Sequence, residues 1–304
     1  MAASIPTIHG WSGAGQLHGA PATGGDETDA VSLVYRFHKG ERITMEVTHR
    51  ARTSTTIAGS RQEVETATDS HKVWTIVDVD DEGHATLEHS VENVAISTRS
   101  SDRGELRWDS RTGDPSPPGY EAMSASLGQP LSRVTVDRRG HVLRRVDLKS
   151  VPTTNTGDFL VVPLPDGPVR PGDHWTFPRE LVVEVPNGPR KSIRTRVLYE
   201  LETIEDGVAT IRVDTTVLTP IDDPRLEVRL LERIWDGKVR FDVARGVVLE
   251  RSTDTDRRVI GFSGPDSSLH YAAHLGEKLV ENASPPLGEG PEVVEEQQAS
   301  QKGS

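Results

Sequence analysis

The sequence contains no cysteine, and this absence removes several classes of function. A chain without thiols forms no disulfide, no thiolate metal site, no cysteine nucleophile and no acylated cysteine anchor. A metal ion would therefore need His, Asp or Glu ligands alone. Aromatic residues are also few, at 5% of the 304 residues. Because large aromatic side chains dominate the burial of small β cores, we expect Trp74, Trp175 and Trp235 to lie in the core.

Long apolar runs are missing too. The apolar cluster from Phe159 to Val162 is far shorter than the ~20 residues of a membrane-spanning helix, so we predict no transmembrane segment. The first 30 residues contain no Lys or Arg and no apolar run, and we therefore expect neither a secretory signal peptide nor a transit peptide there. Serine nucleophile elbows, phosphate-binding glycine loops and dinucleotide-binding fingerprints are also missing, so we predict no cofactor.

The formal charge of −12 is concentrated at the two ends of the chain. Residues 1–30 contribute −3 and residues 281–304 contribute −4, which leaves −5 for residues 31–280. Both ends are rich in Gly, Ala, Ser, Pro, Glu and Gln and have little apolar surface to bury, so we predict disordered tails over 1–30 and 281–304. The body lacks the strong basic excess of nucleic-acid-binding domains, and we expect no nucleic-acid partner.

The apolar residues of the body alternate with period two. From Ala209 to Val217, for example, every second residue is apolar or Thr, and the residues between them are polar. This pattern is typical of antiparallel strands that bury one face and expose the other. Residues 269–275 alternate in the same way and predict one further strand, with a helix as the alternative.

Helical signals occur at two places. Asp223 and Pro224 supply an N-cap and a first-turn proline, and apolar residues then recur at helical spacing over 224–235 until Gly237. A weaker pattern with spacings of three and four runs over 118–128. We therefore predict one helix in each half of the body.

Turn motifs recur in the same order in both halves. Lys39-Gly40-Glu41 matches Pro171-Gly172-Asp173, Asp81-Glu82-Gly83 matches Glu205-Asp206-Gly207, and Arg139-Gly140 matches Arg245-Gly246. We predict a mainly β fold with a few helices, built from two tandem repeats over 31–150 and 158–280 with a linker at 151–157. Each repeat is predicted to be a curved, half-barrel-like antiparallel sheet, whose concave apolar face one helix covers.

The first repeat has about 19 more residues than the second, located between Arg99 and Pro118. This insertion contains Leu106 and Trp108 after Gly104, and we predict a hairpin there. Long insertions are common places for binding.

Candidate binding residues come from the predicted concave faces, their helices and the insertion. His49 and His89 continue apolar faces, where an imidazole can line a cavity, act as a general base or be an ordinary core residue. The full candidate set for ligand binding is His49, His89, Trp108, Met123 and Trp235. No metal site is predicted, since His270 and His274 would lie ~13 Å apart on a strand.

The turn chemistry of the body also suggests a family. Several turn motifs resemble those between the strands of uncharacterised bacterial envelope proteins. They are Gly167 to Trp175, Asp206 to Thr210, and Phe241-Asp242 followed by Arg245-Gly246. The sheets of those proteins are similar to the half-barrels of periplasmic lipoprotein carriers of the LolA type. Over residues 31–280, the resemblance implies a periplasmic or cell-envelope protein. The missing catalytic motifs favour a protein that is not an enzyme.

The predicted helix-covered curved sheets, together with the missing catalytic motifs, favour binding of an apolar ligand, either a lipid or a lipid-modified molecule, or of a partner segment. Two alternatives stay open on the residues alone. One is a structural or protein-interaction module that presents sheet edges and the Trp108 loop. The other is a hydrolase that uses His49 or His89 with a neighbouring carboxylate.

Overall fold

The computed structural model describes residues 30–149, 160–184 and 190–280. The predicted tails and the predicted linker at 151–157 lie outside these ranges, apart from Ala30. The strands are β1 Arg42–Ile57, β2 Ser60–Val79, β3 Ala85–Ser100, β4 Gly104–Asp109, β5 Ser132–Val136, β6 Val142–Asp147, β7 His174–Glu184, β8 Arg190–Glu205, β9 Val208–Val217, β10 Asp236–Asp242, β11 Val247–Ile260 and β12 Ser268–Leu279, and the helices are α1 Glu121–Ser124 and α2 Pro224–Leu230.

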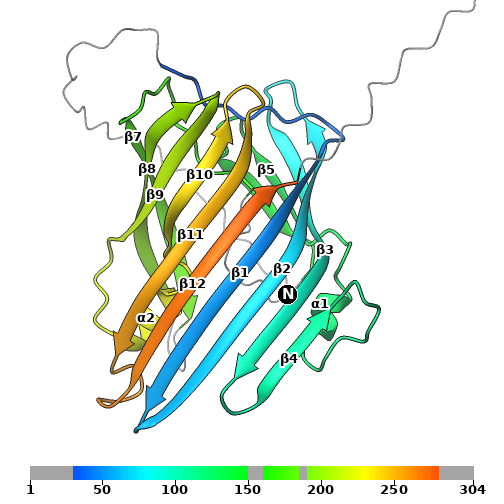
Figure 1. The fold of residues 1–304 in the computed structure, drawn as a ribbon. Coiled ribbons are helices and arrows are strands. Elements are labelled where there is room, and N and C mark those ends of the chain that lie inside the picture. The colour runs from blue at the N-terminus through cyan, green and yellow to red at the C-terminus, as the bar shows by residue number, and fades with distance from the viewer. Residues whose placement is uncertain (1–29, 150–159, 185–189, 281–304) are drawn as a thin grey trace, which may run out of the picture. The chain divides into compact units, whose positions relative to one another are not determined.

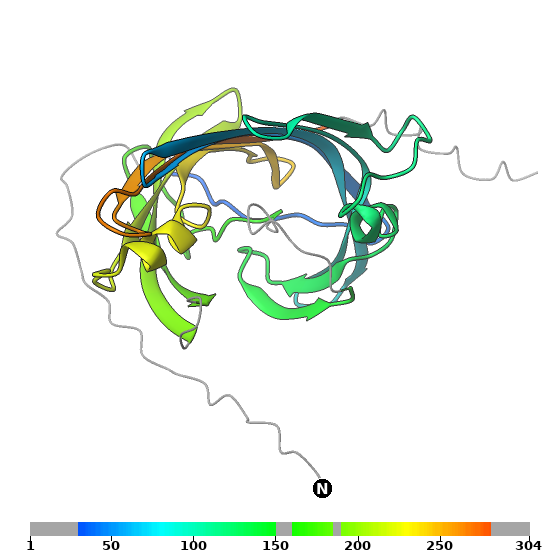
Figure 2. The same ribbon diagram turned by 90° about the horizontal axis from the view of Figure 1, so that it is seen from below.

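All twelve strands belong to one antiparallel sheet (Figure 1). Their order is β6-β5-β3-β2-β1-β12-β11-β10-β9-β8-β7, and β4 pairs with the C-terminal residues 95–100 of β3. Figure 2 shows that the sheet curves, so that its green and yellow-green ends bend toward each other. Among the described residues no pairing joins β6 to β7, and the sheet is open. The predicted mainly β fold with a curved antiparallel sheet is confirmed.

The chain builds this sheet in two meanders. The first, β1-β2-β3-β5-β6, runs outward to one edge, and the second starts at the other edge with β7 and returns to the middle. There β12 pairs with β1 over twelve residue pairs, from Met45 with Leu279 to Thr56 with Ser268. The two predicted repeats thus share one continuous sheet. The segment 269–275 lies in a strand, as predicted.

The two halves have the same order of elements and several equivalent contacts. The amide of Gly40 donates to Ile76 O at 2.8 Å, and the amide of Gly172 donates to Leu201 O at 2.7 Å. Gly140 and Gly246, in the β5–β6 and β10–β11 turns, both have positive φ, at 79° and 66°. These contacts agree with an internal duplication, which stays a prediction.

The inner face of the sheet is defined here as the face that carries the largest buried cluster. Members of this cluster include Met45, Trp74, Leu87 and Phe241. Each is at most 4% exposed. The opposite, outer face carries most of the charged side chains of the strands, because neighbouring residues of a strand point to opposite faces.

Two extended segments, 31–39 and 160–170, fill much of the space along the inner face (Figure 2). They meet where Val31 and Val169 exchange backbone hydrogen bonds at 2.9 Å. Leu33 and Leu164 are almost fully buried in the main cluster. The prediction assigned this covering role to the helices alone. Residues 31–37 have the period-two alternation of a strand, but this local pattern does not specify that the segment covers the inner face.

The helices lie on the inner face, beside the main cluster. In α2, Leu226 and Leu230 pack against Leu181, Val183 and Ile193 of β7 and β8. The side chain of Asp223 accepts a hydrogen bond from the amide of Arg225, which confirms the predicted N-cap. Both helices are shorter than predicted: α1 covers 121–124 of the expected 118–128, and α2 ends at Leu230.

Tyr35 ties the two inner segments together, and its removal gives a first prediction. Its hydroxyl donates to Val162 O at 3.1 Å and accepts from Val162 N at 2.7 Å. Burial raises the pKa of Tyr35, so the phenol stays neutral and can both donate and accept a hydrogen bond. Tyr35→Phe leaves these buried backbone groups without that partner, and we expect it to lower the free energy of unfolding by about 1–3 kcal/mol. Urea unfolding measures the loss. Tyr120→Phe, whose hydroxyl has no hydrogen bond among the described residues, is the control and should change stability by less than ~0.5 kcal/mol.

Candidate functional site

The inner face changes character along β1. Ile43, Met45 and Val47 are buried in the main cluster, whereas the next inner positions, His49, Ala51 and Thr53, are half-exposed. The same change occurs on neighbouring strands, because the paired residues there are small. The half-exposed region, called the inner patch below, consists of His49, Ala51 and Thr53 of β1, Thr66 and Thr68 of β2, Thr255 of β11 and Ala273 of β12.

The inner patch lies between two helix-covered apolar clusters. On one side, Ala51 and Ala273 pack against a cluster that contains Leu231 of the turn after α2. On the other side, Thr68 pairs with Ile96, which belongs to the cluster beneath α1. The patch is therefore a strip of methyl and hydroxyl groups with apolar borders.

His49 is the titratable residue of the inner patch. Burial lowers the pKa of His49, and Arg50 and His274 lower it further, whereas Glu232 raises it. Its Nε2 atom is buried and has no hydrogen-bond partner among the described residues. Within the same residues, no carboxylate oxygen lies within ion-pair distance of the ring. A hydrolase would need a carboxylate in contact with this imidazole, so the described geometry of His49 gives that alternative no support.

His89 lies higher on the inner face and is only 4% exposed. Its ring stacks on Trp74, with the ring centroids 4.7 Å apart and an interplanar angle of 28°. Since Trp74 belongs to the main cluster, His89 occupies a core position.

The remaining candidates occupy two other places. Trp108 is buried beneath α1, where Met123 and Tyr120 pack against its cluster. The predicted hairpin of the insertion is present as β3–β4, and its tryptophan points to the core. Trp235 packs against the main cluster, and the Arg251 guanidinium lies 6.0 Å from its ring centroid, within cation–π range. The structure thus places the five candidates on one face without bringing them into one contact group.

A buried ionic cluster on the inner face was not predicted. Glu277 accepts a hydrogen bond from Lys72 Nζ at 2.7 Å and a second from Arg251. All three side chains are at most 10% exposed. Burial alone would raise the pKa of Glu277, but Arg251 and Lys72 outweigh it and hold that pKa below its usual value. One signal was present: Glu277 continues the apolar alternation of Tyr271, Ala273 and Leu275 on β12.

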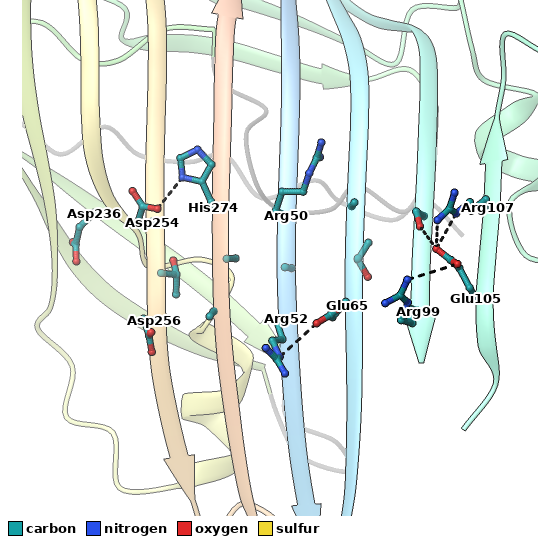
Figure 3. A pocket seen from close by; sticks show the side chains of 17 residues that line it. Arg50, Arg52, Glu65, Arg99, Glu105, Arg107, Asp236, Asp254, Asp256 and His274 are labelled. Carbon is teal, nitrogen blue, oxygen red and sulfur yellow. Dashed lines mark hydrogen bonds and ion pairs between the residues drawn. The ribbon is translucent and has the colours of Figure 1, made fainter. Parts of the chain in front are cut away.

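The outer face carries a wide groove with a volume of about 870 Å³ (Figure 3). Two parallel rows of outer-face side chains line it, and Ala51, Thr66, Thr255 and Ala273, which lie between the rows along the strands, complete the lining. Row 1 consists of Asp236, Asp254, His274, Arg50, Ala67, Ser97 and Arg107, and row 2 consists of Asp256, Ala272, Arg52, Glu65, Arg99 and Glu105. The three small residues of the rows, Ala67, Ser97 and Ala272, form parts of the floor between long charged side chains.

Charge is divided along this groove. Asp236, Asp254 and Asp256 lie at the β10–β11 end, and two arginines share Glu105 at the β3–β4 end (Figure 3). Asp254 contacts His274 at 2.8 Å. Glu105 contacts Arg107 at 2.8 Å and Arg99 at 3.8 Å. Hydrogen bonds from Arg107 and Ser97 lower the pKa of Glu105.

Two other kinds of site are absent from the residues that the structure describes. No group of three or more His, Asp or Glu side chains is arranged to hold a metal ion. His270 and His274 instead contact Asp256 and Asp254 separately, each at 2.8 Å. No helix in these ranges is long and apolar enough to cross a membrane.

Comparisons with known proteins give a similarity in fold only. No family model matches the chain, and no curated protein sequence matches it. Among solved structures, the chain is similar to one described as lipid-protein interactions in lipovitellin, with a TM-score of 0.45 and 9% identity. The similarity covers 84% of this chain and 26% of that chain, so the chain spans about a quarter of that protein's length.

Proposed function

We propose that the protein is a non-enzymatic binding protein of the cell envelope, and that the inner patch holds an apolar ligand such as one lipid chain. The observation that carries this proposal is the half-exposed strip of Ala and Thr methyl groups between two helix-covered apolar clusters. Pockets for apolar ligands are concave and mainly apolar, with few polar groups. The half-exposed His49 imidazole, whose Nε2 atom is buried, supplies one such polar group at the edge of the strip.

The upper part of the inner face is already occupied by the chain itself. Two cavities among its side chains measure about 30 and 10 Å³, enough for water at most and far too small for a hydrocarbon chain. The inner patch spans four strands, or roughly 14 Å at ~4.8 Å per strand. An acyl chain that lies along the strands is narrower than this width, so part of one chain can lie against the patch. The predicted candidates Trp108 and Met123 border it through the α1 cluster, and Trp235 follows the turn after α2.

The envelope location rests on the resemblance of the turn motifs to envelope proteins with half-barrel sheets. A lipid or a lipid-modified protein is the partner that fits this location. The alternative of a protein-interaction module is favoured by a different surface, the outer groove, and is developed in the next subsection.

Blocking the inner patch gives the test. Ala273→Trp places a large ring over the strip, and we expect it to weaken the binding of palmitate and of a 16-carbon lysophospholipid at least tenfold, measured by isothermal titration calorimetry. Ala272→Trp is the matched control, because residue 272 lies next in the chain and points to the outer face. The control should bind both probes like the unmodified protein.

Two results would contradict the proposal. The first is that the unmodified protein, after delipidation, binds neither probe, which would rule out an apolar ligand of this kind. Equal loss in both variants would show that the ring acts through the strand and not through the patch. Near-ultraviolet circular dichroism and the unfolding midpoint establish that both variants are folded.

A further inference from the structure

Each row of the outer groove is complementary in charge and size to the same row of a second copy whose strands run in the reversed order. Row 1 reads, from β11 to β4, Asp254, His274, Arg50, Ala67, Ser97 and Arg107, and row 2 reads Asp256, Ala272, Arg52, Glu65, Arg99 and Glu105. Reversal sets β11 opposite β4, β12 opposite β3, and β1 opposite β2. Consider a second copy whose outer face meets that of the first. When a twofold axis parallel to the strands, between β1 and β2, relates the two copies, the second copy presents this reversed order.

Charge matches in this arrangement. Asp254 at one end of row 1 lies opposite Arg107 at the other end. In row 2, Arg52 lies opposite Glu65. Arg107 shares Glu105 with Arg99, so one of these two guanidinium groups has a positive charge in excess at the β3–β4 end. Within the described residues, Asp254 has the imidazole of His274 as its only ion-pair partner and contacts no Lys or Arg.

Size matches as well. Arg50 lies opposite Ala67, Arg99 lies opposite Ala272, and His274 lies opposite Ser97, so long side chains of one copy stand over the small floor residues of the other. The sixth pair, Asp256 with Glu105, brings two carboxylates together. Five of the six facing positions are therefore complementary in charge or in size.

We propose that the outer face is a twofold interface between two copies of this chain. A twofold interface uses the same patch on both copies, with residue i of one copy contacting residue j of the other and the reverse. The six facing strands, β11 to β4, span about 24 Å, and with one flanking row on each side the face is about 25 Å long, which gives roughly 600 Å² per copy, or about 1,200 Å² in total. Specific, stable protein interfaces bury about 1,200–2,000 Å² in total, so the face reaches the lower end of that range.

Charge exchange between two variants tests this interface. Asp254→Arg and Arg107→Asp each place like charges opposite each other at two symmetry-related contacts, and we expect each to weaken the dimer at least ~100-fold. In an equimolar mixture, each variant supplies the charge that the other has lost, so a heterodimer forms with both contacts restored. Sedimentation velocity distinguishes a 33.3 kDa monomer from a dimer of twice that mass, and fluorescent labelling of one variant identifies the mixed species.

Matched controls lie on the same face outside the groove. Glu250→Arg and Arg240→Asp break an exposed ion pair of 3.4 Å on β11 and β10 without touching either row. Both should dimerise like the unmodified protein. Ala272→Tyr is a second variant that keeps all charges and fills the floor under the facing Arg99, and it should be monomeric. Raising the salt concentration should weaken the unmodified dimer, because exposed charges are screened.

Three results would overturn the proposal. The first is that the unmodified protein is monomeric at 200 µM and low salt. The second is that each charge-reversed variant dimerises by itself as well as the unmodified protein does. The third is that the mixture of the two variants stays monomeric. Asp256→Asn adds an independent check with the opposite sign, because it removes the like-charged pair with Glu105 and should strengthen the dimer several-fold. A failure here leaves the inner-patch proposal untouched, since the two surfaces lie on opposite faces.

Discussion

Glu277→Gln is expected to lower the free energy of unfolding by about 3–5 kcal/mol, the usual cost of removing one partner from a buried ion pair. Glu277 contacts both Lys72 and Arg251, and each of the three side chains is at most 10% exposed. The amide that replaces the carboxylate carries no charge, so both buried cations lose the anion that they share. For a folded body of this size, at about 2–4 °C per kcal/mol, the unfolding temperature should fall by roughly 10 °C.

Glu46→Gln is the control for this prediction. Glu46 lies on β1, the strand next to β12, and is exposed. It has no ion pair among the described residues, and its neutralisation should change stability by less than ~0.5 kcal/mol. Differential scanning calorimetry of both variants gives the comparison. A loss in Glu277→Gln no larger than in Glu46→Gln would mean that the buried cluster does not stabilise the sheet.

The pH dependence gives the same prediction a second measurement. The pKa of Glu277 is held below its usual value by Arg251 and Lys72 against the opposing effect of burial. The unfolded chain therefore binds a proton at Glu277 more readily than the folded protein does. Its contribution is present above the unfolded pKa, near 4.5, and is lost as the pH falls through the lower folded pKa. The stability difference between the unmodified protein and Glu277→Gln should thus shrink below about pH 4.

Local patterns in the sequence predicted the elements of this fold but not their long-range assembly. Alternation identified the strands, and Asp223 with Pro224 identified the start of α2, because both signals depend on neighbouring residues. The pairing of β12 with β1 joins segments more than 200 residues apart, and no local pattern specifies it. The Lys72–Glu277 contact spans 205 residues for the same reason.

The candidate residues show the same division. His49 and His89 were placed on the inner face correctly, since alternation fixes the face of a strand residue. Which of them is covered depends on segments 31–39 and 160–170, whose contacts with the sheet are long-range and are specified by no local pattern. The outer groove escaped prediction altogether, because its rows run across strands and its members are far apart in the chain.

Gly140→Ala is expected to lower the free energy of unfolding by about 3 kcal/mol. Gly140 has a φ of 79°, a left-handed conformation that costs other residues about 1–2 kcal/mol. A Cβ atom there would also lie 2.7 Å from Val162 O and 2.7 Å from the Tyr35 ring. Relieving such overpacking costs a further 1–3 kcal/mol. The turn would push the two inner segments away from the sheet.

Gly104→Ala separates these two contributions. Gly104 has nearly the same φ, 78°, but a Cβ atom there would meet nothing within 4 Å. It should lose only the ~1–2 kcal/mol of backbone strain. Gly246→Ala, whose Cβ would lie 2.6 Å from Val34 O, should resemble Gly140→Ala. Equal losses at Gly104 and Gly140 in urea unfolding would show that the inner segments tolerate the extra methyl group.

A double variant then tests whether the turn and the inner segments act as one unit. The hydroxyl of Tyr35 holds Val162 through two hydrogen bonds, and the methyl group at position 140 would displace the same two residues. Once Gly140→Ala has moved Tyr35 and Val162 apart, their hydrogen bonds are already weakened, so Tyr35→Phe costs less stability. The combined loss should therefore be smaller than the sum of the single losses by about 1 kcal/mol, a coupling typical of residues in direct contact. Strict additivity would mean that the β5–β6 turn does not hold the inner segments against the sheet.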